Sequence, residues 1–267
     1  MIAIFKQTFK EKKWTILIYI TSGILLLWMY IALFPSIQKS IGDLNQYMQN
    51  LPQGFLKAFG FDAASFGTFE GYIGSEQFTF VWPILLISFM VSFGSAFLSG
   101  EIEKGTMEFL LSQPVSRIKI FLGKLFAGIL NLVLFVIVSI LAVFPLAKIY
   151  DISIKSEGFY KLTLLGFVFG LAIFGLAMLF SAIFSEKSKA TFTVVGILIG
   201  MYVLNIMSGL KDNLDKLKYI SFFHYFVPSD ILVHNQIDNK AYWIFLGTFL
   251  IASFLGLIWF KKRDVAI

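Results

Sequence analysis

Two glycines in the segment SGEIEKGTMEFLLSQPVSRIKIFLGK, residues 99–124, have the spacing of a phosphate-binding loop. Gly100 and Gly105 are separated by four residues. A Walker A loop also needs a lysine and then a serine or threonine directly after its second glycine, to reach the β- and γ-phosphates and magnesium. Thr106 and Met107 stand there instead, and no strand is expected before the loop. The sequence therefore predicts that this chain does not hydrolyse ATP itself.

The other reactive side chains are too few or too isolated for a catalytic site. The chain has no cysteine and two histidines, which excludes thiolate chemistry, disulfides, iron–sulfur clusters and Cys- or His-rich metal sites. An intramembrane enzyme needs several polar groups together at membrane depth. The apolar stretches offer only isolated ones, such as Ser88, Ser92, Asn131 and Asn205, with no base beside them. We therefore expect a protein that is not an enzyme, with no cofactor, metal or catalytic residue of its own.

The composition is that of a membrane protein. Of the 267 residues, 58% are hydrophobic and 14% are charged, and the mean hydropathy is +0.81. Soluble domains average about 25% charged and 45–50% apolar residues. The chain therefore has too little polar surface to cover a water-soluble globule of its length.

Six stretches of 20 to 23 residues contain no Asp, Glu, Lys, Arg or His. A hydrocarbon core of about 30 Å takes about 20 helical residues at about 1.5 Å each, so each stretch is long enough to cross once. Because no water satisfies the backbone there, the spans must be helical. The sequence predicts an all-α integral membrane protein with a single transmembrane domain over residues 1–267, whose spans are about 15–35, 78–98, 125–147, 162–184, 191–210 and 241–260.

Basic residues are unevenly distributed between alternate loops. The N-terminus, the second and fourth loops and the C-terminus hold 13 Lys and Arg in 53 residues, whereas the other three loops hold 9 in 86. Loops rich in Lys and Arg stay in the cytoplasm. We therefore expect a protein of the bacterial plasma membrane with both termini on the cytoplasmic side. The net charge of +6 then reflects topology and attraction to anionic lipid, and no nucleic-acid partner is expected.

Three segments outside the spans are expected at the membrane surface. The N-terminal 14 residues place apolar side chains on one helical face and lysines on another. This pattern favours an amphipathic interfacial helix over an ordinary basic flank. The first outer loop, 36–77, has apolar residues at helical spacing with Gly and Pro breaks, which predicts one or two short amphipathic helices. Tyr219–Pro228 is too short and too interrupted to span, and it predicts an interfacial or re-entrant segment.

The spans themselves lack charge and carry two small-residue motifs. Transporters driven by ions or protons usually keep intramembrane Asp, Glu, His or Arg for the coupling ion, and the six stretches contain none. A sodium site built from carbonyls and hydroxyls is an alternative, but the simplest inference is that any transport is powered from outside the membrane. Gly166-x-x-x-Gly170 and Gly196-x-x-x-Gly200 permit close helix approach, either inside one subunit or at a dimer face.

The cytoplasmic loop between the second and third spans contains a predicted short helix over residues 101–112. Pro114 ends it, and Ser116 can cap the next helix. Exposed apolar residues on a short charged helix favour a docked partner over solvent. The alternative is a solvated loop whose basic residues merely follow the positive-inside rule. The helix would present Met107, Phe109, Leu110 and Leu111 together with Glu101, Glu103, Lys104 and Glu108.

The sequence here resembles the membrane subunits of type-2 ABC exporters. Gly100–Lys124 reads G-E-x-E-x-G-T-x-x-x-L-L-x-x-P-x-S-R-x-x-x-x-x-G-K, which is similar to that family's coupling-helix loop. The terminal F-x-x-R-D (Phe260, Arg263 and Asp264) is similar to its closing signature, and LPQGFLKAFGFD and FEGYIGSEQF in the first outer loop are also similar. The resemblance covers the whole chain, although the fifth loop is longer than the family's minimal form.

This resemblance implies a function and a set of partners. Six helices would follow an amphipathic connecting helix, and two permeases, identical or paralogous, would sit on two separate ABC ATPase subunits that hold ATP and magnesium. Closure of the ATPases would push on the coupling helix and export the cargo, with Arg117, Glu101 and Glu103 as polar anchors. The implied ATPase-coupling residues are Glu101, Glu103, Lys104, Gly105, Thr106, Met107, Glu108, Phe109, Leu110, Leu111, Pro114 and Arg117.

The interior suggests a class of cargo. An uncharged, Phe-rich path suits an amphipathic or lipophilic molecule such as an antimicrobial peptide, toxin or drug. The candidate lining residues are Phe89, Phe93, Phe135, Phe174 and Phe180, although phenylalanine equally faces lipid in membrane proteins. Export of another cargo, such as an ion or a lipid-linked glycan, and a non-transporting membrane anchor or sensor are the alternatives.

Overall fold

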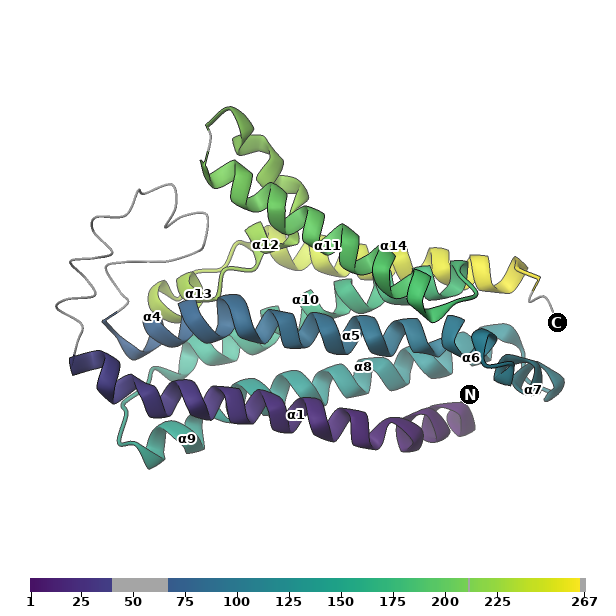
Figure 1. Cartoon of the computed structure of the whole chain (residues 1–267), viewed down its shortest axis with the longest axis horizontal. Helices are drawn as coiled ribbons and strands as arrows, with labels where there is room; N and C mark the ends of the chain where they lie inside the picture. Colours follow the sequence, from purple (N-terminus) through teal and green to yellow (C-terminus); the bar gives the residue numbers. More distant parts are fainter. Residues whose placement is uncertain (40–66, 211, 265–267) are drawn as a thin grey trace.

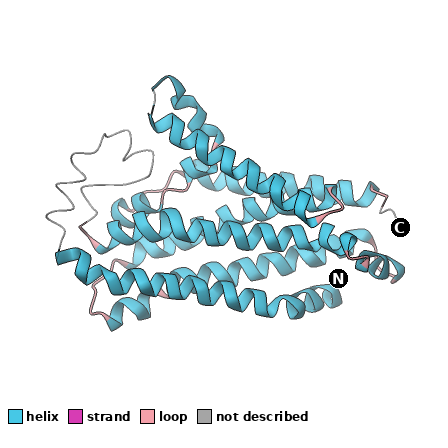
Figure 2. Cartoon of the chain, in the orientation of Figure 1, coloured by secondary structure: helices cyan, strands magenta, loops and turns pink. Residues whose placement is uncertain are grey.

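The computed structural model of the chain describes residues 1–39, 67–210 and 212–264. These residues fold entirely into helices and connecting turns, with no strand among them (Figure 2). Six of the helical runs are long and apolar enough to cross a membrane. The prediction of an all-α membrane protein with six spans is therefore confirmed.

The six runs follow the predicted stretches closely. Each run begins before its predicted stretch and includes polar residues there, because the backbone hydrogen bonds of a helix can continue beyond the apolar residues. They are α1 (Ile2–Lys39), the run of α4 (Phe69–Ile73), η1 (Gly74–Val81) and α5 (Trp82–Phe97), the run of α8 (Arg117–Leu141) and α9 (Val143–Ile149), α10 (Ser156–Ile183), α11 (Lys187–Leu210) and α14 (Asn239–Lys262).

The second span begins earlier than its charge-free stretch. Thr68 caps α4 by accepting a hydrogen bond from the Gly71 backbone N–H at 3.1 Å, which fixes the start of the helix. The chain then passes through η1, a π-helical segment, into α5. Glu70 and Glu76 consequently lie on this helical run, outside the predicted stretch of 78–98.

Helix α10 is the centre of the bundle. It packs along α5, α8 and α14, while α1 packs along α8 (Figure 1). In the most apolar 18-residue segment of α10, 72% of the residues are buried, whereas in that of α11 only 17% are buried. Helix α11 therefore lies at the edge, and Figure 1 shows its later part leaving the bundle.

The start of α1 and the end of α14 lie at the same end of the bundle (Figure 1). Two short helices, α6 (Ser99–Glu103) and α7 (Thr106–Ser112), lie at this end too. We call it the α7 end. The opposite end, which holds α13 (Pro228–His234), is the α13 end. An even number of spans between the termini requires this arrangement.

The N-terminal segment is not a separate helix. Helix α1 runs without a break from Ile2 to Lys39, so the amphipathic residues continue directly into the first span. No glycine or proline between them provides a turn. Most of the first outer loop, where short amphipathic helices were expected, lies outside the described residues.

The fifth loop returns to the bundle after η2 (Asp212–Ile220), as a re-entrant segment does. It forms α12 (Phe222–Tyr225) and α13. Phe226, between them, is buried and stacks on Phe169 at 4.4 Å and on Trp82 at 5.9 Å between ring centroids. Trp82 also donates a hydrogen bond to Ser139 at 2.8 Å. Aromatic packing at the α13 end therefore fixes this loop against α5, α8 and α10.

The two small-residue motifs have different roles. A Cβ atom on Gly166 would lie 2.7 Å from Trp82, and one on Gly170 would lie 2.5 Å from Leu132. That motif therefore serves packing inside the subunit. A Cβ atom on Gly196 or Gly200 would meet nothing within 4 Å, so this second motif faces outward from α11.

The close approach of α8 to α10 yields a test of the packing. A Cβ atom on Gly128 would overlap the ring of Phe174, whereas one on Gly247 would meet nothing within 4 Å. We expect Gly128→Ala to lower the free energy of unfolding in detergent by about 1–3 kcal/mol through overpacking. Gly247→Ala, the matched control on α14, should be neutral or slightly stabilising. Equal stability of the two variants would contradict the observed packing.

Candidate functional site

The loop between the second and third spans forms two helices. The prediction of one helix over residues 101–112 is wrong, because the chain breaks at Gly105, between α6 and α7. Gly105 has φ of +72°, in the left-handed region, which glycine adopts without a steric penalty. A Cβ atom there would meet nothing within 4 Å. The glycine is therefore required for the turn and not for a close approach.

A buried serine on α10 ties the junction of α5 and α6 to the centre of the bundle. The Ser181 hydroxyl accepts hydrogen bonds from the backbone N–H groups of Leu98 and Ser99, at 3.1 and 3.0 Å. It donates to the carbonyl of Ser95 at 3.0 Å. Since these backbone N–H groups are buried, their shared partner is a strong constraint. No sequence motif pointed to Ser181.

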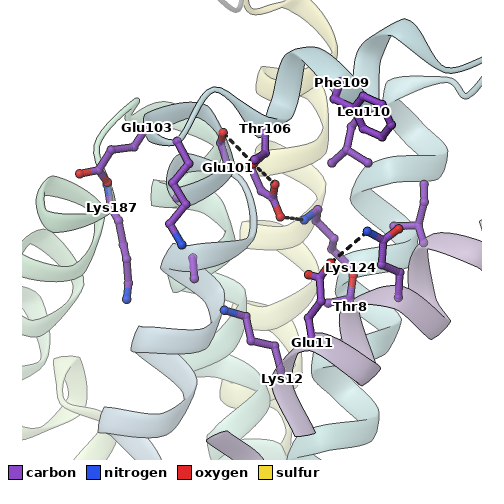
Figure 3. A pocket seen from close by; sticks show the side chains of 15 residues that line it. Thr8, Glu11, Lys12, Glu101, Glu103, Thr106, Phe109, Leu110, Lys124 and Lys187 are labelled. Carbon is purple, nitrogen blue, oxygen red and sulfur yellow. Dashed lines mark hydrogen bonds and ion pairs between the residues drawn. The ribbon is translucent and has the colours of Figure 1, made fainter. Parts of the chain in front are cut away.

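Glu101 connects α6 with α7 and α8 (Figure 3). Its carboxylate forms an ion pair with Lys124 at 2.9 Å, and the Lys124 side chain is only 3% exposed. Thr106 donates hydrogen bonds to both the carbonyl and the carboxylate of Glu101. Burial alone would raise the pKa of Glu101, but attraction to Lys124 and the hydrogen bonds from Thr106 and Lys124 outweigh it and lower that pKa. Glu101 is therefore ionised at neutral pH.

Glu103 connects α6 with α11. Its carboxylate accepts a hydrogen bond at 2.8 Å from the backbone N–H of Lys187, the first residue of α11. A carboxylate at a helix N-terminus satisfies a free N–H group and opposes the positive end of the helix dipole. Glu101 and Glu103 thus bind neighbouring parts of their own chain, and a role for either in contacting an ATPase stays a prediction.

The apolar side chains of α7 point in different directions. Met107 is fully buried and anchors α7 to its own subunit, so it is not available to a partner. Phe109 is 69% exposed. Leu110 and Leu111 are partly buried against the core. Of the four apolar residues expected to be presented together, Phe109 alone is mainly exposed, because a helix turn separates the faces of residues two apart.

Arg117 brings the loop together with the chain's C-terminal motif. Its guanidinium donates hydrogen bonds to the carbonyls of Phe260, at 3.2 Å, and of Arg263. Arg263 in turn donates to the carbonyls of Ala182 and Phe184, both at 2.9 Å. The two segments that carried the family resemblance are therefore in direct contact, and together they hold the ends of α8, α10 and α14.

The remaining predicted loop residues are exposed. Lys104 lies at the turn beside Gly105, and Glu108 lies on the outer side of α7. Pro114 follows the end of α7, and Ser116 caps α8 by accepting a hydrogen bond from the Lys119 backbone N–H at 3.4 Å. The predicted helix stop and helix cap are therefore confirmed.

A pocket of about 580 Å³ lies between α7 and the start of α1 (Figure 3). Helices α5, α6, α8 and α11 contribute the remaining walls. No group of three or more His, Asp or Glu residues in the described part of the chain could hold a metal ion. The lining residues are Ile4, Gln7, Thr8, Glu11, Lys12, Ala96, Gly100, Glu101, Glu103, Lys104, Thr106, Phe109, Leu110, Lys124 and Lys187.

Most of the predicted cargo-path phenylalanines lie in the packed interior. The Phe89 ring packs against Phe93 and Phe135, each at 5.4 Å between centroids, and Phe174 packs edge-to-face on Phe97 at 6.1 Å. Phe89, Phe93, Phe135 and Phe174 are buried, whereas Phe180 is partly exposed. The four buried rings do not face lipid, and a role in the cargo path stays a prediction.

Comparison with known proteins identifies the family. The family model described as ABC-2 family transporter protein matches residues 3–265. A search of curated proteins finds no match. Proteins of this family are membrane components of ABC exporters, not the ATP-binding subunits, and they normally work with an ATPase subunit. The match spans nearly the whole chain and agrees with the six membrane-spanning helices, so the chain belongs to the ABC-2 transporter family and is a multi-pass membrane permease.

Proposed function

We propose that this permease is driven by two separate ATPase subunits that push on α7. The observation that carries the proposal is Phe109, a large apolar side chain left 69% exposed on a short helix that Met107 anchors in its own subunit. A phenylalanine in this position is costly in water and is suited to a cleft on a partner. In this account the α7 end faces the cytoplasm, as the basic residues of the loops predict.

The contacts of α6 and α7 explain how such a push would reach the spans. Ser181 fixes the α5–α6 junction to α10, Glu101 is paired with Lys124 of α8, and Glu103 bonds to the start of α11. Displacement of α7 would therefore move the ends of four spans together. The Ser181 hydrogen bonds are buried, and the bonds of Glu101 and Glu103 are charge-assisted, which makes them stronger than neutral hydrogen bonds.

A second permease copy or a paralogue would complete the translocation path. Helix α11 is the least buried span, and Gly196 and Gly200 face outward from it. Small residues let two helices approach closely in a membrane, which supports α11 as part of the contact between permeases. For the cargo we propose an amphipathic or lipophilic molecule, because the charge-free stretches of the spans offer no charged side chain to bind an ion.

The energy source tests this function. We expect export by the permease–ATPase complex in proteoliposomes to continue when the proton gradient is collapsed at constant ATP, and to stop when ATP is removed. The permease alone should show no ATPase activity. Glu76→Gln, which removes the acidic residue nearest the second predicted span, serves as a control and should leave ATP-driven export unchanged. Export that stops with the gradient while ATP is kept would overturn the proposal.

A further inference from the structure

The pocket beside α7 gathers basic side chains from four parts of the chain. Lys12 comes from α1, Lys104 from the turn after α6, Lys124 from the start of α8 and Lys187 from the first residue of α11. Lys104, Lys124 and Lys187 are all close enough to Lys12 to repel it electrostatically. Figure 3 shows Lys12 and Lys187 reaching into the pocket from opposite sides.

Within the described residues, one of these four ammonium groups is paired and three are not. Lys124 is paired with Glu101. The Glu103 carboxylate accepts a hydrogen bond from the backbone N–H of Lys187, and Glu11 accepts one from the Gln7 side chain at 2.9 Å. Among the described residues, no hydrogen bond or ion pair is formed by the side-chain nitrogens of Lys12, Lys104 and Lys187. The pocket lining thus holds four lysines and three carboxylates, Glu11, Glu101 and Glu103, of which Glu11 attracts Lys12. The remaining excess of positive charge favours an anionic ligand.

Three of the pocket's lysines lie just before charge-free stretches of the spans. Lys12 precedes the charge-free stretch 15–35 by three residues, Lys124 directly precedes 125–147, and Lys187 precedes 191–210 by four. Because a helix rises about 1.5 Å per residue, these ammonium groups are expected at headgroup depth if the charge-free stretches fill the hydrocarbon core. Ile4, Ala96 and Leu110 add apolar surface to the same pocket, and its volume of about 580 Å³ is within the usual range for small-ligand sites.

We propose that this pocket binds a phosphate group, of the kind that an anionic phospholipid headgroup presents, between Lys12, Lys104 and Lys187. A basic pocket between membrane helices on the cytoplasmic side has the chemistry for such headgroups. The bound phosphate bridges α1, the α6–α7 turn and α11. Occupancy would therefore hold the start of α1 against α7. The inference rests on the proposed cytoplasmic orientation of the α7 end, but it does not depend on an ATPase partner.

Native mass spectrometry of the detergent-solubilised permease, titrated with phosphatidylglycerol or phosphatidylcholine, tests this site. Phosphatidylglycerol should bind more tightly than zwitterionic phosphatidylcholine. A lysine beside an anionic headgroup contributes about fivefold in affinity, so Lys12→Gln/Lys187→Gln should weaken phosphatidylglycerol binding about 25-fold. Lys12→Arg/Lys187→Arg should retain it. Neither position lies on α6 or α7, so the proposed ATPase contact is left intact.

The matched control removes the same charge from the same end of the bundle. Lys6→Gln/Lys10→Gln changes two exposed lysines of α1 that do not line the pocket, and it should leave the affinity nearly unchanged. Displacement of the lipid by inorganic phosphate would show that the phosphate alone is recognised, and resistance to displacement would identify the phospholipid as the ligand. Equal losses in the pocket and control variants would overturn the proposal. So would loss of ATPase association with unchanged lipid binding, because an acidic partner side chain would then be the ligand.

Discussion

Replacing Phe109 with serine is expected to weaken ATPase association strongly, and export with it, while the permease stays folded and inserted. The side chain is 69% exposed, so little packing inside the subunit is lost. If the ring is buried in a partner, its removal costs about 1.5–3 kcal/mol, which weakens ATPase binding about 10- to 100-fold. A pull-down of the ATPase, with a membrane-insertion assay beside it, measures both effects.

The neighbouring residues of α7 supply the controls for this prediction. Glu108→Ser changes an exposed residue of the same helix and should leave ATPase recovery nearly unchanged. Met107→Ser removes a buried anchor, so it should lower the stability of the permease as well as its association. Full ATPase recovery with Phe109→Ser would remove α7 from the coupling interface.

Gly105→Val is expected to cause a comparable loss of export by a different route. A β-branched residue strongly disfavours the φ of +72° found here, so the turn between α6 and α7 should be distorted and Phe109 displaced. Because a Cβ atom at this position meets nothing within 4 Å, steric overlap with neighbours makes no contribution. Backbone strain is then the sole direct effect of the substitution.

A graded series of substitutions at this position isolates the strain. Asparagine tolerates the left-handed region better than alanine, and alanine better than valine. ATP-driven export in proteoliposomes should therefore fall from Gly105→Asn through Gly105→Ala to Gly105→Val. Equal activity of the asparagine and valine variants would show that the left-handed turn is not needed for coupling.

The spans could be predicted because a single physical requirement determines them. A helix in the hydrocarbon core needs about 20 residues without charge, and charges are scarce enough in this chain to mark each end. The start of the second span was harder to predict from the sequence, since Thr68 caps a helix that continues through polar residues before the apolar stretch. Helix ends depend on such local hydrogen bonds, which hydropathy does not report.

The sequence located the loop that forms the site, but it did not predict the turn at Gly105 or the directions of the side chains. The helix stop at Pro114 and the cap at Ser116 follow from local rules. The break at Gly105 does not, because a glycine permits a left-handed turn without requiring one. Which of Met107 and Phe109 faces outward depends on where α7 packs. Ser181 is far from the loop in sequence, so no local pattern could have placed it at the α5–α6 junction.

The most direct test of the central claim is cross-linking from position 108, the exposed neighbour of Phe109 on α7. The chain has no cysteine, so Glu108→Cys gives the permease a single thiol that can carry a short photoreactive cross-linker while Phe109 and the assembled complex are kept. We expect cross-links to the ATPase subunit that change in yield when ATP is bound. Asn239→Cys, at the start of α14, should instead react with an impermeant thiol reagent from outside the cell. It should form no cross-links to the ATPase subunit. Labelling of position 108 from outside intact cells, without cross-links to the ATPase, would contradict both the orientation and the coupling role of α7.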